Sequence, residues 1–163
     1  MNYSIKNIIL LTALIISCSY VVAQEEAIAA ANKVNELKSA STKFHNISYS
    51  IFLITDINKD GVFEVIERVN EIENQSLGLL NLEMYPAFQM DKIYKYTNGV
   101  YVENYADYRE YLNMRKEHFK LWKKLIENPE LLSDDSKSLI KFNKDLFLNE
   151  ITRIIASINK KMQ

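Results

Sequence analysis

The feature that most constrains this chain is the stretch Asp56–Glu64, which reads D-I-N-K-D-G-V-F-E. Oxygen-bearing side chains recur at alternate positions, and Gly61 allows the sharp turn because glycine adopts positive φ without steric cost. Such spacing wraps a short loop around a hard cation such as Ca²⁺, which takes about six to eight oxygen ligands. The expected ligands are four side chains and one backbone carbonyl: Asp56, Asn58, Asp60, Val62 and Glu64.

Two other interpretations of this stretch stay open. An acidic surface turn would use the same residue types, because Asp, Asn and Gly are the commonest turn residues. An EF-hand would place Glu67 at its twelfth position as a bidentate ligand and Phe63 at its apolar eighth position. The entering segment, 51–55, is rich in β-branched residues, which suits a strand better than a helix. The sequence therefore favours a strand-loop-strand site.

The residues from Tyr49 to Glu67 resemble a single FG-GAP or VCBS-type repeat. The resemblance is carried by Leu53-Ile54-Thr55, then the acidic loop, then Val65-Ile66. It implies a Ca²⁺ loop between two strands, with the same five ligands. A β-propeller of such repeats needs at least about four blades, and this chain has one motif, so propeller architecture is not implied. A single loop of this kind is similar to those of small exported bacterial proteins.

The N-terminal segment has the pattern of an export signal. Lys6 is the only charged residue in 1–23, and an apolar run of nine residues follows at 8–16, interrupted only by a threonine. This run is shorter than the roughly 17–25 residues that a membrane-spanning helix needs, and it suits a signal-peptide core. Cleavage before Gln24 competes with lipidation of Cys18 at a lipobox-like site. We expect a periplasmic or secreted protein, or alternatively an outer-membrane lipoprotein.

Composition limits what the mature chain, 24–163, can be. Cys18 is the only cysteine, so the mature protein forms no internal disulfide. The net charge of the whole chain is −1, which gives no basic excess for binding nucleic acid. Membrane association is expected only if Cys18 is lipidated. Three glycines and two prolines argue against a loop-rich or all-β fold.

Periodicity predicts a single α+β domain with a sheet region at 47–103 and a helical pair at 105–161. The Asn98-Gly99 pair predicts a type I′ hairpin turn, and Ser133 is the expected N-cap of the last helix. The two C-terminal helices should cover one face of the sheet as an antiparallel pair. The expected elements are a helix at 24–43, strands at 47–55 and 62–67, a hairpin at 92–102, and helices at 105–128 and 133–161.

Catalytic signals are scarce. The two histidines, His45 and His118, are far apart in sequence and are expected to be structural or solvated. The sequence contains no recognisable nucleophile, zinc or phosphate-binding motif, so we expect no enzyme. Tyrosines concentrated at 94–111 leave room for an aromatic binding surface. The expected partner is an unidentified protein or envelope component.

Overall fold

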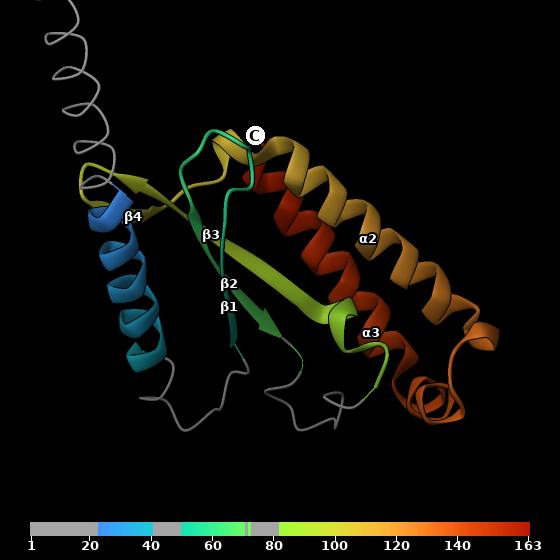
Figure 1. Ribbon diagram of the computed structural model, residues 1–163. Coiled ribbons are helices and arrows are strands. Elements are labelled where there is room, and N and C mark those ends of the chain that lie inside the picture. The colour runs from blue at the N-terminus through green and yellow to red at the C-terminus, as the bar shows by residue number, and fades with distance from the viewer. Residues whose placement is uncertain (1–22, 41–49, 71, 73–81) are drawn as a thin grey trace, which may run out of the picture.

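The computed structural model describes residues 23–40, 50–70, 72 and 82–163. Its centre is a four-stranded antiparallel sheet in the order β1-β2-β3-β4 (Figure 1). The strands are β1 (Ser50–Thr55), β2 (Glu64–Asn70), β3 (Gln89–Thr97) and β4 (Val100–Glu103). The α+β class predicted from the sequence is confirmed.

Helices lie on both sides of this sheet. Residues 23–40 form a helix on one side, and a pair of longer helices lies on the other (Figure 1). The pair consists of α2 (Arg109–Glu127) and α3 (Asp134–Lys161), which run alongside each other as predicted. Short 3₁₀ turns complete the fold: η4 (Tyr85–Phe88), η5 (Ala106–Tyr108) and η6 (Pro129–Leu131).

The two sides of the sheet bury different cores because successive strand residues point to opposite faces. The larger core lies against α2 and α3 and includes Ile93 of β3, Phe119 of α2 and Phe147 of α3, which are each at most 1% exposed. The smaller core lies under the N-terminal helix, where Ala30 packs with buried residues of the sheet: Val65, Tyr94 and Tyr101. The fold is therefore a three-layer arrangement with the sheet in the middle.

Local turn and cap chemistry behaves as predicted. Asn98 and Gly99 have φ values of 51° and 87°, the two positive values that a type I′ turn requires, and they join β3 to β4. The side chain of Ser133 accepts a hydrogen bond from the backbone N–H of Ser136, so Ser133 caps α3. Asn143 departs from helical geometry inside α3, with φ −127° and ψ 16°, and its side-chain amide donates to the carbonyl of Leu139 at 3.0 Å.

The second strand differs from its predicted bounds. It begins at Glu64 instead of Val62, because the backbone N–H groups of Val62 and Phe63 donate to the carboxylates of Asp60 and Glu26. Since β2 continues to Asn70, the exiting helix that an EF-hand requires is absent here, and that alternative is wrong for the fold of the loop.

Several predictions concern residues outside the ranges that the structure describes. These are the apolar run and both processing sites within 1–22, the end of the first helix at 41–43, the start of the first strand at 47–49, and His45. In the described ranges, no helix is both long enough and apolar enough to cross a membrane.

Candidate metal-binding loop

The acidic stretch forms the loop between β1 and β2, closed by the pairing of Thr55 with Glu64. Two residues of the loop have positive φ, Lys59 at 62° and Gly61 at 86°. A Cβ placed on Gly61 would meet nothing within 4 Å, so the requirement for glycine comes from the backbone conformation and not from lack of space. Lys59 adopts the left-handed region without being glycine, which the sequence pattern did not predict.

Side-chain carboxylates hold this loop closed through its backbone amides. Asp56 accepts from the N–H of Asp60 at 3.1 Å through Oδ1 and from the N–H of Gly61 at 3.0 Å through Oδ2. Asp60 accepts from the N–H of Val62 at 2.8 Å, and this bond is the main cause of its lowered pKa. The amide of Asn58 donates to the other oxygen of Asp60 at 2.8 Å. These bonds gather three of the predicted ligands within one turn of chain.

Glu64 lies beneath the loop and is 0% exposed. Its Oε2 accepts from the backbone N–H of Ile57 at 2.8 Å, and its Oε1 accepts from the hydroxyl of Tyr108 at 3.0 Å. Burial raises the pKa of Glu64 despite these two bonds, and the charges of Asp60 and Asp56 raise it further. In the part of the chain that the structure describes, no lysine, arginine or histidine forms an ion pair with Glu64.

Glu67 belongs to a different environment from the other predicted ligands. It stands three residues after Glu64 on β2, so the two side chains point to opposite faces of the sheet. Glu67 accepts hydrogen bonds from Ser50 at 3.2 Å and from Lys92 and Tyr94 at 3.3 Å each. The structure therefore gives Glu67 a set of cross-strand partners, while Glu64 faces the loop.

The N-terminal helix contacts the loop at Phe63. Its Glu26 accepts from the backbone N–H of Phe63 at 2.6 Å, and the hydroxyl of Tyr101 on β4 donates to the Phe63 carbonyl at 2.9 Å. A mainly apolar hollow of about 340 Å³ lies beside this contact, and its lining includes Ala27, Ile54 and Gly61. Sequence reasoning missed this contact because Glu26 and Phe63 are 37 positions apart.

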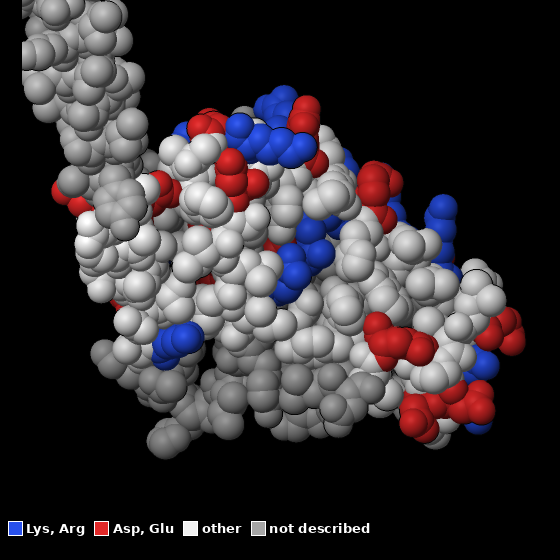
Figure 2. Space-filling view, viewed as in Figure 1, with Lys and Arg blue, Asp and Glu red and all other residues white. Residues whose placement is uncertain are grey.

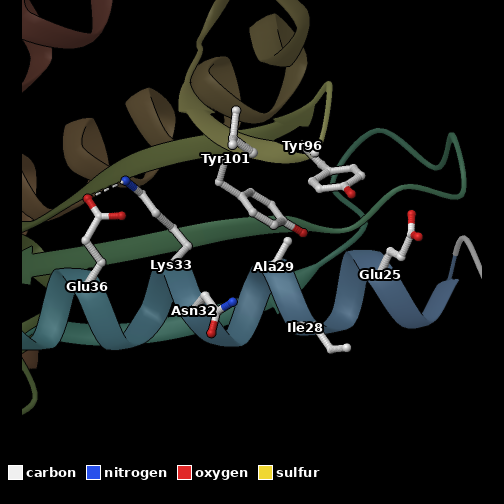
Figure 3. Close-up of a pocket in the computed structure, with 10 residues that line it drawn as sticks. Glu25, Ile28, Ala29, Asn32, Lys33, Glu36, Tyr96 and Tyr101 are labelled. Atoms are coloured by element: carbon white, nitrogen blue, oxygen red, sulfur yellow. Dashed lines mark hydrogen bonds and ion pairs between the residues drawn. The ribbon is translucent and has the colours of Figure 1, made fainter.

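A second hollow, of about 490 Å³, lies between the N-terminal helix and the β3–β4 hairpin (Figure 3). Tyr96 and Tyr101 form one wall, with ring centroids 5.3 Å apart. On the helix side, Lys33 forms an ion pair with Glu36 at 3.1 Å (Figure 3). The groove brings aromatic, apolar and charged groups together, and part of the predicted tyrosine-rich surface lines it.

The loop offers oxygen ligands of the right chemistry, although the carboxylates are turned toward backbone amides. In the described residues, no group of three or more His, Cys, Asp or Glu side chains is arranged so that it could hold a metal ion. The chain matches no family model, no curated protein and no solved structure. The likeness to FG-GAP and VCBS-type repeats therefore stays a resemblance of about twenty residues, of the kind a short motif supports.

Proposed function

We propose that this protein is an exported, non-catalytic calcium-binding module in which Ca²⁺ stabilises the junction between β1 and β2. The observation that carries the proposal is Glu64, a fully buried carboxylate that forms no ion pair in the described part of the chain. Lys95 feels its charge but forms its ion pair with Asp107. A buried charge is costly unless it is paired or coordinates a metal. Asp56 and Asp60 add repulsion to the same carboxylate, and a bound cation would relieve both effects.

The chemistry of the ligand set favours Ca²⁺ over other metals. Three carboxylates, one amide and one backbone carbonyl supply only oxygen, which hard cations prefer. A carboxylate oxygen that accepts one N–H bond keeps further lone-pair capacity, so the backbone bonds of Asp56 and Asp60 orient these groups without exhausting them. Mg²⁺ demands tighter octahedral geometry and gives up water reluctantly, so it should substitute poorly.

The export part of the proposal rests on the sequence at 1–23, and the non-catalytic part on the scarcity of catalytic motifs. Intact-mass measurement on protein from its native host tests export: the mature chain should begin at Gln24 or at lipidated Cys18. Full-length protein recovered from the cytosol would contradict export and leave the calcium proposal standing.

Calcium binding is tested by thermal melting of residues 24–163 across a calcium titration. Because Ca²⁺ would bind only the folded loop, Tm should rise with concentration. A single extracellular-type loop should have a Kd of about 10⁻⁴–10⁻³ M. Asp56→Ala should abolish the response, and Glu130→Gln, which removes an exposed carboxylate on η6, should leave it intact. A melting curve unmoved by millimolar Ca²⁺ would show that the loop is an acidic turn.

A second candidate function is that of an interaction protein, and the groove of Figure 3 favours it. Ile28 and Val100 at this groove are 55% and 57% exposed, which gives it an apolar rim beside the tyrosines. Aromatic and apolar groups of this kind are enriched at the centres of protein interfaces. Crosslinking in the native host, compared between wild type and Ile28→Asp, would test whether a partner contacts this groove.

A further inference from the structure

A polar cluster lies between the sheet and α2. Its centre is Asp91 of β3, whose side chain is 2% exposed. Three members come from one face of α2, since positions 111, 115 and 118 follow helical spacing. The groups around Asp91 come from β2, β3 and α2: Arg68, Gln89, Tyr111, Arg115 and His118.

Two guanidinium groups in this cluster share one carboxylate. Arg68 Nε lies 2.7 Å from Asp91 Oδ1, and Arg68 Nη2 lies 3.2 Å from Oδ2. Arg115 Nε lies 2.9 Å from the same Oδ2, without the alignment of a hydrogen bond. Within the described residues, neither arginine forms an ion pair with a second carboxylate. Two cations against one anion leave an excess of one positive charge.

This excess charge is held mostly out of water. The side chains of Arg68 and Arg115 are 23% and 11% exposed. Burial, together with repulsion from Arg68, lowers the pKa of Arg115. A desolvated charge without a full counter-charge is unfavourable. The cluster therefore lacks negative charge, whereas the guanidinium N–H groups supply enough hydrogen-bond donors.

Gln89 and His118 of this cluster each carry a buried polar atom without a hydrogen-bond partner. Gln89 is 4% exposed, and its side-chain Nε2 has no hydrogen-bond partner. Its backbone carbonyl accepts from Arg115 Nη2 at 2.7 Å, which fixes Gln89 next to the guanidinium. His118 Nε2 is also buried without a partner, but burial lowers the pKa of the ring and the ring bonds to the Pro86 backbone, so Nε2 of the neutral ring is an acceptor and would not bind an oxyanion. Native structures leave few such atoms unsatisfied, and an oxygen acceptor would satisfy the Gln89 amide.

We propose that this cluster binds a small oxyanion, a carboxylate or a phosphate group, through the donors of Arg68 and Arg115 that the Asp91 carboxylate does not occupy. The planar fork of arginine matches both oxyanions and forms charge-assisted hydrogen bonds with them. The ligand enters from the side of Arg68, the more exposed of the two. In Figure 2, Lys and Arg atoms reach the surface between the sheet and the helical pair, where a charged ligand can approach.

The test uses inorganic phosphate and acetate as probes, with a chelator present so that metal binding does not contribute. Thermal melting of the protein should show a saturable rise in Tm with probe concentration, at constant ionic strength made up with chloride. Signals of the Gln89 side-chain amide should shift over the same concentration range in ¹H–¹⁵N spectra. A response to only one probe supports the proposal and identifies the class of oxyanion.

Variants separate a built site from general charge effects. Arg68→Gln should weaken the response at least about tenfold, because one fork of the pair is lost. Lys120→Gln removes one positive charge from the exposed surface of α2 and should respond like wild type. If Arg68→Gln does not fold, Arg68→Lys keeps the charge but loses the fork, and it should also bind more weakly. No saturable response in wild type, or an equal loss in the Lys120 variant, would overturn the proposal.

Discussion

Tyr108 donates its hydroxyl to the buried carboxylate of Glu64 across 3.0 Å, although the two residues stand 44 positions apart. Tyr108 is 2% exposed and immediately precedes α2, so this bond joins the helical layer to the base of the acidic loop. Burial raises the pKa of Tyr108 and the Glu64 carboxylate raises it further, which keeps the phenol a donor throughout the physiological range. The proposed metal site and the C-terminal helices are therefore linked through one side-chain contact.

Tyr108→Phe should destabilise the protein by about 1–3 kcal/mol, because it removes one of the two donors that this buried carboxylate has among the described residues. Urea unfolding at pH 7 measures the change. Tyr96→Phe is the matched control, because Tyr96 is half-buried on β3 and its hydroxyl has no hydrogen-bond partner in the described structure. Equal stability of wild type and Tyr108→Phe would show that the contact contributes nothing.

The raised pKa of Glu64 predicts a particular pH dependence in the absence of calcium. The folded state holds the Glu64 proton more tightly than the unfolded state, so the free energy of unfolding falls as pH rises from 4.5 through the raised value. Asp60 acts in the opposite sense and in another window: its lowered pKa adds stability that is lost as pH falls below 3.8. Urea unfolding from pH 3 to pH 7, with a chelator present, measures the contributions of Glu64 and Asp60 to the free energy of unfolding.

Glu64→Gln isolates the Glu64 contribution in that experiment. The variant cannot ionise; its one amide oxygen can accept from the Ile57 N–H, and its NH₂ group can donate to the Tyr108 hydroxyl. Its decline in stability above pH 4.5 should therefore be smaller than that of wild type. Saturating Ca²⁺ should also remove the decline in wild type, since the metal favours the ionised carboxylate. Superimposable profiles of variant and wild type would show that Glu64 does not titrate in this range.

Gly99→Val should destabilise the β3–β4 hairpin by about 1 kcal/mol or more, because a β-branched residue is strained at positive φ. No atom lies within 4 Å of a Cβ built on Gly99, so the cost is conformational and does not come from a clash. Gly99→Asn is the control, since Asn tolerates the left-handed region. Thermal melting compares the two, and an equal loss in both would argue against strain as the cause.

Among the features that the sequence predicted correctly, the turns and the helix cap are set by neighbouring residues. The Asn98-Gly99 turn, the Ser133 cap and the reversal at Gly61 each follow from short-range backbone and hydrogen-bond chemistry. The packing of the N-terminal helix on the sheet was not predictable in this way, because it depends on Ala30 meeting Val65 and residues further along the chain.

The candidate site shows the same division between local and distant information. The sequence favoured Glu64 over Glu67 as the last ligand but left both open, and strand alternation separates them once β2 is known to begin at Glu64. The pairing of Arg68 and Arg115 with Asp91 brings together residues of β2, β3 and α2. Single residues at such separations carry no periodic signal, so sequence reasoning missed the cluster.

The contrast between Glu64 and Glu67 gives the sharpest prediction for the metal. Glu64 faces the loop, whereas Glu67 lies on the other side of the sheet with Ser50, Lys92 and Tyr94 as partners. Glu64→Gln should therefore abolish the rise in Tm on adding Ca²⁺, and Glu67→Gln should keep it. Isothermal titration calorimetry on both variants gives the same comparison independently of stability.

Glu64→Gln and Glu67→Gln are charge-matched controls for each other, because each removes one negative charge from β2. Both should remain folded, since glutamine keeps one acceptor oxygen, for Ile57 at position 64 and for Lys92 and Tyr94 at position 67, and its NH₂ group can donate to the hydroxyl on the other side. Loss of calcium binding chiefly in Glu67→Gln would mean that β2 rearranges to turn Glu67 toward the loop. Loss in both to the same degree would mean that calcium responds to the overall negative charge of β2 and not to a defined ligand.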